Sequence, residues 1–322
     1  MVTQQERDEI FMRRCLELAA QGRQNAKPNP MVGAVIVSER GDIIGEGYHV
    51  RCGEGHAEVN AFASVCPGDE RLLPSATLYV SLEPCAHYGK TPPCADLIVR
   101  KGVRRVVCGC VDPFAKVRGR GIERIRQAGI EVTVGVLRRE CEELNKRFFT
   151  FQRHHRPYII LKWAQTADGF LDDHFRPLVM STPFTRMLSH RLRAENDAIL
   201  VGHVTDLREH PSLTTRYWPG PDPKRLVLEG GMDIHRLLDQ LYRQQVQSLV
   251  VEGGAKTHQS FIAAGLYDEI RVEVAPLLVG EGTPAPHLPA GLRLESQYDY
   301  DGNIITTYRE NEDQSFYGPS GE

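Results

Sequence analysis

The sequence predicts an α/β protein made of two layered domains. Its 322 residues correspond to about two domains of ordinary size. Segments with the two-residue alternation of strands are interleaved with segments in which apolar residues recur at helical spacing. A polar, basic joint at 152–157 separates two such series. We therefore expect one domain over residues 1–150, a second over 151–310, and a polar tail over 311–322.

The first half opens with a helical pattern over 7–21, followed by a hairpin. Residues 32–38 and 43–49 alternate as strands, and Gly41-Asp42 supplies the turn between them. Strands and helices then alternate, which predicts a mixed sheet covered by helices. The expected helices are 56–65, 95–101, 121–128 and 137–149, and the expected strands are 78–81, 105–109 and 132–136.

The second half repeats this alternation. Pro183 stands in the first turn of one predicted helix, and Gly253-Gly254 precedes another. The end of the series is richer in strands, so we again expect a helix-covered sheet. The expected strands are 158–164, 198–202, 225–228, 248–252, 270–275, 293–298 and 304–309, and the expected helices are 183–193, 234–244 and 258–264.

Composition excludes several classes of partner. Hydrophobic residues make up 41% and charged residues 25%, the balance of an ordinary globular chain. The net charge of -3 provides no basic field for nucleic acid, and no apolar run approaches the roughly 20 residues of a membrane span. The first residues lack the basic and apolar regions of a signal peptide, so we expect a cytoplasmic protein with reduced cysteines.

His56-Ala57-Glu58, read with Pro84-Cys85 and Cys94, predicts a zinc site. Zinc prefers nitrogen and sulfur ligands in a tetrahedron, and a catalytic site leaves one position for water. One imidazole, two thiols and a free carboxylate match the H-x-E…P-C-x-x-C signature of zinc deaminases, in which Glu58 would be the acid/base. Unrelated buried thiols and an ordinary histidine are the alternative reading. Eight residues separate the two cysteines here, instead of two.

These predicted elements also suggest a mechanism. His56 and Cys94 fall at the starts of predicted helices, where the helix dipole lowers a thiol pKa, so we expect Cys85 and Cys94 to be thiolates. Zinc lowers the pKa of its water toward ~7. Glu58 would take the water proton as an amidine carbon is attacked, and would return it to the leaving ammonia.

Four stretches of the first half resemble the bifunctional deaminase/reductase family of riboflavin biosynthesis. They are 26–35, 45–49, 56–61 and 81–94, and the eight-residue cysteine spacing is typical of that family. The resemblance implies a cytidine-deaminase-like domain whose substrate is a phosphorylated pyrimidine, a diaminopyrimidinone with a ribosylamino 5′-phosphate. It implies zinc binding by His56, Cys85 and Cys94, with Glu58 catalytic. It places Asn29, His49, His87, Lys90 and Asp112 at the substrate, although Lys90 taken alone reads as a solvated lysine.

The second half resembles the reductase of the same family over 162–169, 192–202, 211–216 and 250–255. This implies a dihydrofolate-reductase-like fold that uses NADPH to reduce the ribosyl group to ribityl, and a homo-oligomer. Substrate residues would be Arg193, Leu213, Arg216 and Glu252. Cofactor residues would be Gln165, Thr205, Glu209, Gly253 and Gly254.

The second half also departs from the family pattern. Glu209-His210 and Phe170 replace the usual residues, and the predicted strand 225–228 runs almost directly into the helix at Ile234. Family members have several tens of residues there, so we expect a domain that has lost an internal block. A deaminase with a non-catalytic, reductase-like assembly domain is therefore an alternative. A nucleic-acid base deaminase is a further one, which the net charge and the cysteine spacing oppose.

Overall fold

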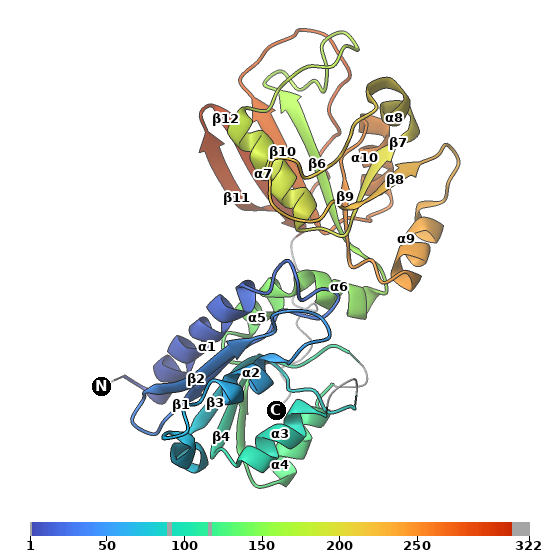
Figure 1. Cartoon of the computed structure of the whole chain (residues 1–322). Coiled ribbons are helices and arrows are strands. Elements are labelled where there is room, and N and C mark those ends of the chain that lie inside the picture. The colour runs from blue at the N-terminus through green and yellow to red at the C-terminus, as the bar shows by residue number, and fades with distance from the viewer. Residues whose placement is uncertain (1, 89–91, 115–117, 311–322) are drawn as a thin grey trace. The chain divides into compact units, whose positions relative to one another are not determined.

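The computed structural model describes residues 2–88, 92–114 and 118–310 (Figure 1). The chain forms two compact units that divide between His155 and Arg156. Each unit is an α/β structure around its own mixed sheet, as the sequence predicted. The polar tail expected at 311–322 lies outside the described residues.

The sheet of the first unit has the strand order β2-β1-β3-β4-β5. The predicted hairpin is present, and its first strand also pairs antiparallel with β3. The remaining pairs, β3 with β4 and β4 with β5, are parallel. The strands are β1 (Gly33–Val37), β2 (Ile43–Tyr48), β3 (Thr77–Leu82), β4 (Arg105–Cys110) and β5 (Glu131–Val134).

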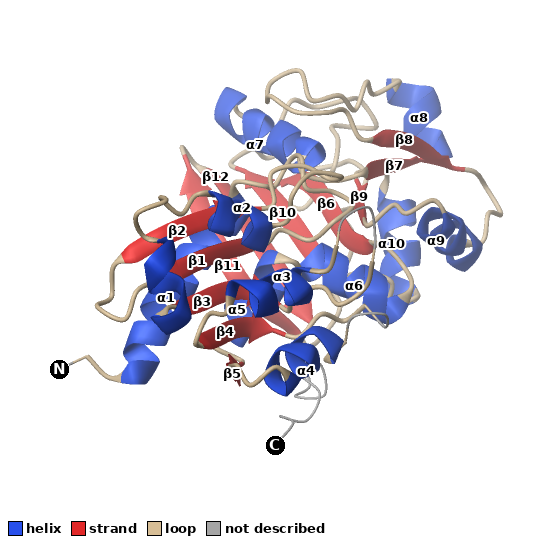
Figure 2. Ribbon diagram, turned by 60° about the horizontal axis from the view of Figure 1, so that its bottom comes forward, coloured by secondary structure: helices blue, strands red, loops and turns tan. Residues whose placement is uncertain are grey.

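Helices cover both faces of this sheet (Figure 2). One face packs apolar residues from α2 (Ala57–Ala63), α3 (Cys94–Lys101) and α4 (Arg120–Gln127). The other face packs α1 (Gln4–Ala20), α5 (Arg138–Leu144) and α6 (Lys146–His154). A 3₁₀ turn at Glu70–Ser75 leads into β3. The zinc-ligand candidates therefore come from the helix-covered face that carries α2 and α3.

Asn145 divides the helix that the sequence predicted over 137–149. It is buried and separates α5 from α6. Its side-chain amide accepts from the Met31 N–H at 2.8 Å and donates to the Met31 carbonyl at 2.8 Å. The prediction of one helix over 137–149 was wrong, because these two hydrogen bonds accompany a non-helical backbone at Asn145, where α5 ends and α6 begins. The same two bonds fix the segment beside Asn29. The joint at 152–157 is also shorter than expected, since residues 152–154 form the end of α6.

The second unit holds a seven-stranded sheet in the order β11-β12-β10-β6-β9-β7-β8. The central pairs are parallel, and β12 pairs antiparallel with β10 and β11. All seven predicted strands are present. They are β6 (Tyr158–Thr166), β7 (Ala198–Gly202), β8 (Lys224–Leu228), β9 (Ser248–Val251), β10 (Glu269–Ala275), β11 (Leu292–Tyr300) and β12 (Asn303–Glu310).

Helix α7 (Pro183–Ala194) packs on one face of this sheet, and α9 (Ile234–Arg243) and α10 (Ala255–Ala263) pack on the other. The sequence did not predict α8 (His203–Glu209), whose residues are all at least partly exposed. Strand β8 is at the sheet edge and passes through 229–233 directly into α9, which is the short connection that the sequence indicated. Among the described residues, every helix is too short or too polar to cross a membrane.

A buried ion pair joins α1 to β4 in the first unit. Asp8 accepts from Arg105 at 2.9 and 2.8 Å, and also from the Tyr79 hydroxyl at 2.9 Å. Without the Asp8 charge, the buried Arg105 guanidinium would pair with the exposed Glu131 carboxylate, which is a weaker partner. Removing one partner of a buried pair typically costs about 3 kcal/mol. We expect Asp8→Asn to lower the free energy of unfolding by about that amount in urea denaturation. A free energy of unfolding equal to that of wild type would contradict this.

Candidate active site

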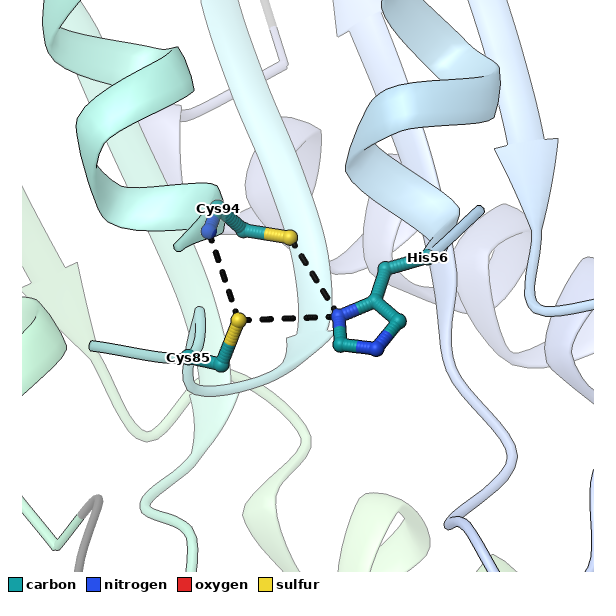
Figure 3. A group of neighbouring side chains, drawn as sticks. All are labelled: His56, Cys85 and Cys94. Atoms are coloured by element: carbon teal, nitrogen blue, oxygen red, sulfur yellow. Dashed lines mark hydrogen bonds between the residues drawn. The ribbon is translucent and has the colours of Figure 1, made fainter. Parts of the chain in front are cut away.

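Three side chains of the first unit point toward one another (Figure 3). His56 is the N-cap of α2, Cys94 is the first residue of α3, and Cys85 lies in the loop that follows β3. One ligand atom from each lies within 4.8 Å of the other two. The structure thus brings together the three residues that the sequence proposed as metal ligands.

The spacing of these atoms suits zinc. His56 Nδ1 lies 3.5 Å from Cys85 Sγ and 3.4 Å from Cys94 Sγ. Around tetrahedral zinc, with a Zn–S bond of about 2.3 Å and a Zn–N bond of about 2.0 Å, a nitrogen and a sulfur ligand are separated by about 3.5 Å. The ligand atoms already occupy one triangular face of such a tetrahedron, so the residues present fit the metal.

The two thiols differ in their tendency to ionise. The Cys94 thiol beside Cys85 is the largest influence that lowers the pKa of Cys85, to about 4; burial opposes it, and His56 and the Cys94 N–H at 3.3 Å lower it further. The same contact, together with burial, raises the pKa of Cys94. In the metal-free chain the Cys85 thiol is therefore the one that ionises readily, and the expectation that both sulfurs are thiolates when zinc is bound stays a prediction.

Glu58 lies in the first turn of α2 with 3% of its surface exposed. Burial raises the pKa of its carboxyl group, and the neighbouring Cys85 adds to that effect. The carboxyl group is also hydrogen bonded to Cys94. A buried carboxyl group with a raised pKa, next to the ligand triangle, is suited to take up and release a proton.

His49 and Asn29 form a wall beside His56. The His49 ring is 2% exposed and packs edge-on against His56, with 5.3 Å between ring centroids. Its Nδ1–H donates to the Gly55 carbonyl, and its Nε2 accepts from Asn29 Nδ2, both at 3.1 Å. Burial lowers the pKa of His49, so the ring is neutral and its tautomer is fixed by these two partners.

Asp112 and His87 come from the loops that follow β4 and β3. Asp112 follows β4, and burial is the main cause that raises its pKa to about 7. Its Oδ1 accepts from the Phe114 N–H at 2.8 Å, and the Phe114 ring lies 6.0 Å from the His87 ring. Lys90, the remaining substrate candidate, lies outside the described residues.

The substrate candidates of the second unit meet at the end of α7. Arg193 donates to both oxygens of Glu252, at 3.0 and 2.7 Å, and also to the Thr214 carbonyl at 3.1 Å. Leu213 is buried with φ of 52°, in the loop that carries the exposed Arg216. Burial acts to raise the pKa of Glu252, but Lys162 and Arg193 outweigh it, so its pKa is lowered and it remains a carboxylate.

Sequence reasoning missed two charged or titratable groups in this cluster. Lys162 is an ammonium group on the central strand β6 and lies near Glu252. His190 is 2% exposed, accepts from the Tyr217 N–H at 3.4 Å, and has a pKa lowered to about 4 by burial and by Arg193 and Arg216. The sequence signal that could have identified Lys162 as a site residue is a charged side chain within an otherwise apolar predicted strand.

Three of the five cofactor candidates, Thr205, Gly253 and Gly254, follow the carboxyl ends of the neighbouring strands β7 and β9. A Cβ at Gly253 would stand 2.6 Å from the Val201 Cα, so only glycine allows this approach. Gly254 caps α10 with φ of 50° and faces Thr205 in the first turn of α8. Two helix N-termini at adjacent strand ends fit the phosphates of NADPH. Gln165, on β6, accepts from the Trp163 indole at 2.8 Å, and Glu209 is the last residue of α8, one turn after Thr205.

Comparison with known proteins agrees with this geometry. A model of the cytidine and deoxycytidylate deaminase zinc-binding region matches residues 5–110, and a model of the RibD C-terminal domain matches 157–229 and 222–299. The riboflavin biosynthesis protein RibD of Aquifex aeolicus is 38% identical over 324 residues, covering 85% of this chain and 88% of the relative. The chain belongs to the RibD family of riboflavin biosynthesis proteins.

Other RibD proteins show the same relationship. The Escherichia coli protein is 36% identical, with 85% of this chain and 89% of the relative covered. The crystal structure of a diaminohydroxyphosphoribosylaminopyrimidine deaminase/5-amino-6-(5-phosphoribosylamino)uracil reductase from Thermotoga maritima is also similar. It has 32% identity and a TM-score of 0.87, with coverage of 96% of this chain and 100% of that one.

Membership of the RibD family defines both units in outline. The first is a zinc-dependent deaminase domain, and the second is a reductase domain whose cofactor is NADPH. The two stretches matched by the C-terminal model overlap at 222–229. That overlap coincides with β8 and its direct passage into α9, where the sequence predicted the loss of an internal block.

Proposed function

We propose that the first unit hydrolytically deaminates 2,5-diamino-6-ribosylamino-4(3H)-pyrimidinone 5′-phosphate. The observation that carries this proposal is the buried Glu58 carboxyl group beside the ligand triangle of His56, Cys85 and Cys94. The deaminase activity of the Thermotoga relative supports the substrate class. The eight-residue spacing of the cysteines leaves room for a loop, 86–93, that can contact a phosphorylated substrate.

In this mechanism His56, Cys85 and Cys94 would hold zinc, which would supply an activated water. Glu58 would accept one proton from the attacking water as the water oxygen adds to the amidine carbon, and would give that proton to the departing amino group. The C–N bond breaks and ammonia leaves. The proton that remains on the added oxygen moves to the ring nitrogen, which leaves a carbonyl group on the ring.

Substrate recognition in this proposal uses polar groups from two parts of the first unit. The buried His49 orients the Asn29 amide, whose remaining polar groups would bind the pyrimidine, and Asp112, which follows β4, would bind it from a second loop. His87 and Lys90 lie on the loop between the cysteines, where their cationic forms would suit a phosphate monoester.

Ammonia release decides between this function and nucleic-acid base deamination. We expect zinc-loaded protein to release one ammonia per pyrimidine phosphate and none from tRNA. Release from tRNA, but not from the pyrimidine phosphate, would overturn the proposal. The acid/base and metal-ligand residues would then need a different substrate.

We also propose that the second unit reduces the deaminated product with NADPH, and that the Glu252–Arg193 pair binds the substrate. Removing a charged hydrogen-bond partner typically costs 1.5–3 kcal/mol, or about 10- to 100-fold. We expect Glu252→Gln to lower kcat/KM for product-dependent NADPH oxidation by about that factor, with ammonia release unchanged. Asp239→Asn on α9, from an exposed pair with Arg243, is the control and should leave both rates near wild type.

The short connection after β8 favours a second candidate, in which this unit is an assembly platform for a homo-oligomer. NADPH fluorescence titration and light scattering distinguish the two. Saturable NADPH binding with turnover rejects the platform. An oligomer that neither binds nor oxidises NADPH would establish it.

A further inference from the structure

Glu83 stands next to the metal-ligand segment, yet the deamination mechanism gives it no role. It directly follows β3 and is 4% exposed. Its carboxyl group accepts four backbone N–H groups from a segment about thirty to forty residues further along the chain. The donors are Asp112 at 3.2 Å and Gly119 at 2.9 Å on Oε2, and Gly121 at 3.0 Å and Ile122 at 3.4 Å on Oε1.

Three of these donors form the N-terminus of α4. The first N–H groups of a helix have no partner within the helix and are usually satisfied by the side chain of the N-cap residue. The N-cap here is Gly119, which has no side chain and adopts φ of 79°. Glu83, which directly follows β3, supplies the acceptor that Gly119 lacks. Its negative charge is also stabilised by the positive end of the helix dipole of α4.

The helix N-terminus is pressed against the residues that lead to Cys85. A Cβ at Gly121 would stand 1.9 Å from the carbonyl oxygen of Pro84, so the contact requires glycine. Pro84 directly precedes the ligand Cys85. Glu83 and Gly121 therefore fix the start of α4 against the metal-ligand segment.

The fourth donor connects Glu83 to the substrate side of the site. The Asp112 N–H is held by Glu83, and the Asp112 carboxyl group in turn accepts from Phe114, whose ring contacts His87. One carboxylate thus joins the end of β4, the start of α4 and the approach to Cys85. Its four bonds use both oxygens, two donors each.

We propose that Glu83 is a positioning residue, which caps α4 from β3 and so holds Asp112 in place for the pyrimidine substrate. This inference rests on the proposed deaminase function. Glu83 itself touches neither the ligand triangle nor the substrate in this assignment; it acts through Asp112 and the backbone of 119–122.

The first test is Glu83→Gln, which keeps the size of the side chain but turns an NH₂ group toward two N–H donors. We expect KM for the pyrimidine phosphate to rise at least about tenfold, kcat to change less, and zinc content to stay at one per chain. Asp8→Asn is the matched control, because it removes a buried carboxylate away from the site. A lowered Tm with unchanged KM, as expected for the control, would overturn the proposal.

A double-mutant cycle tests the route through Asp112. If Glu83 acts by holding Asp112, Glu83→Gln should cost little further kcat/KM in an Asp112→Asn background. Fully additive losses would refute that route. If Glu83→Gln does not fold, Glu83→Asp retains the charge one methylene shorter, and it should give a smaller rise in KM with the same non-additivity.

Amide hydrogen exchange gives a readout independent of activity. Amides of 119–122 should exchange at least about tenfold faster in Glu83→Gln, while those of α3 keep their wild-type protection. Unchanged protection of 119–122 would disprove the cap. If wild type released no ammonia from the pyrimidine phosphate, the proposed function would fail, but the exchange result would still decide whether Glu83 caps α4.

Discussion

Glu58→Gln is expected to abolish ammonia release while zinc remains bound. The amide has the size of the carboxyl group but cannot accept the water proton or return it to the leaving amine. General acid–base groups typically contribute 10²–10⁴-fold, and Glu58 serves at two steps, so we expect kcat to fall by about 10³-fold or more. Single-turnover ammonia release and zinc content by mass spectrometry are the two measurements.

The matched control for this change is Glu142→Gln. Glu142 is also a buried glutamate of the first unit, but it pairs with Arg138 and Arg153 on the helices of the opposite face. We expect it to lower stability and to leave kcat within about threefold of wild type. Ammonia release that survives Glu58→Gln, or that is lost equally in Glu142→Gln, would remove Glu58 from the mechanism.

The metal site was the most predictable part of the molecule, because its chemistry is carried by residue types at fixed positions. His56 and Cys94 follow breaks in the chain and begin helices, so the helix starts fix where their side chains emerge. The strands were predictable for a similar reason, since short apolar runs such as 158–161 in β6 and 249–251 in β9 must be buried whatever the order of the strands.

What sequence patterns did not show depends on partners distant in the chain. Asn145 lies within an amphipathic pattern, and only its two bonds to Met31, 114 residues away, explain why the helix breaks there. Helix α8 has every residue at least partly exposed, so it lacks the apolar periodicity on which helix prediction depends. Tertiary contacts override local preference at both positions.

The candidate site in the second unit was predicted by resemblance more than by physical pattern. Arg193 and Glu252 are 59 residues apart, and their bidentate pair could not be inferred from spacing. His190 has the pattern of an ordinary helix residue until the fold buries it beside Arg193 and Arg216, and burial and the two arginines together lower its pKa. Glu83 is similar, since all four of its donors come from a later segment of the chain.

Cys94→Ser is the second change for which we expect a near-complete loss of activity. A serine hydroxyl is a poor zinc ligand, and the two remaining ligands, His56 and Cys85, leave the metal without its third protein contact. We expect zinc content to fall from one per chain to below about one tenth after dialysis against a chelator, and ammonia release to fall with it. Because the metal-free Cys94 thiol keeps its proton, zinc binding by wild type should also tighten as the pH rises.

Cys108→Ser separates this effect from a general cost of burying a hydroxyl group. Cys108 is fully buried in the same unit, and its thiol donates to the Cys110 carbonyl at 3.2 Å, a bond that a serine hydroxyl can keep. This variant should retain one zinc per chain and wild-type ammonia release. If Cys94→Ser kept its zinc, or if Cys108→Ser lost it, the ligand set of His56, Cys85 and Cys94 would be wrong.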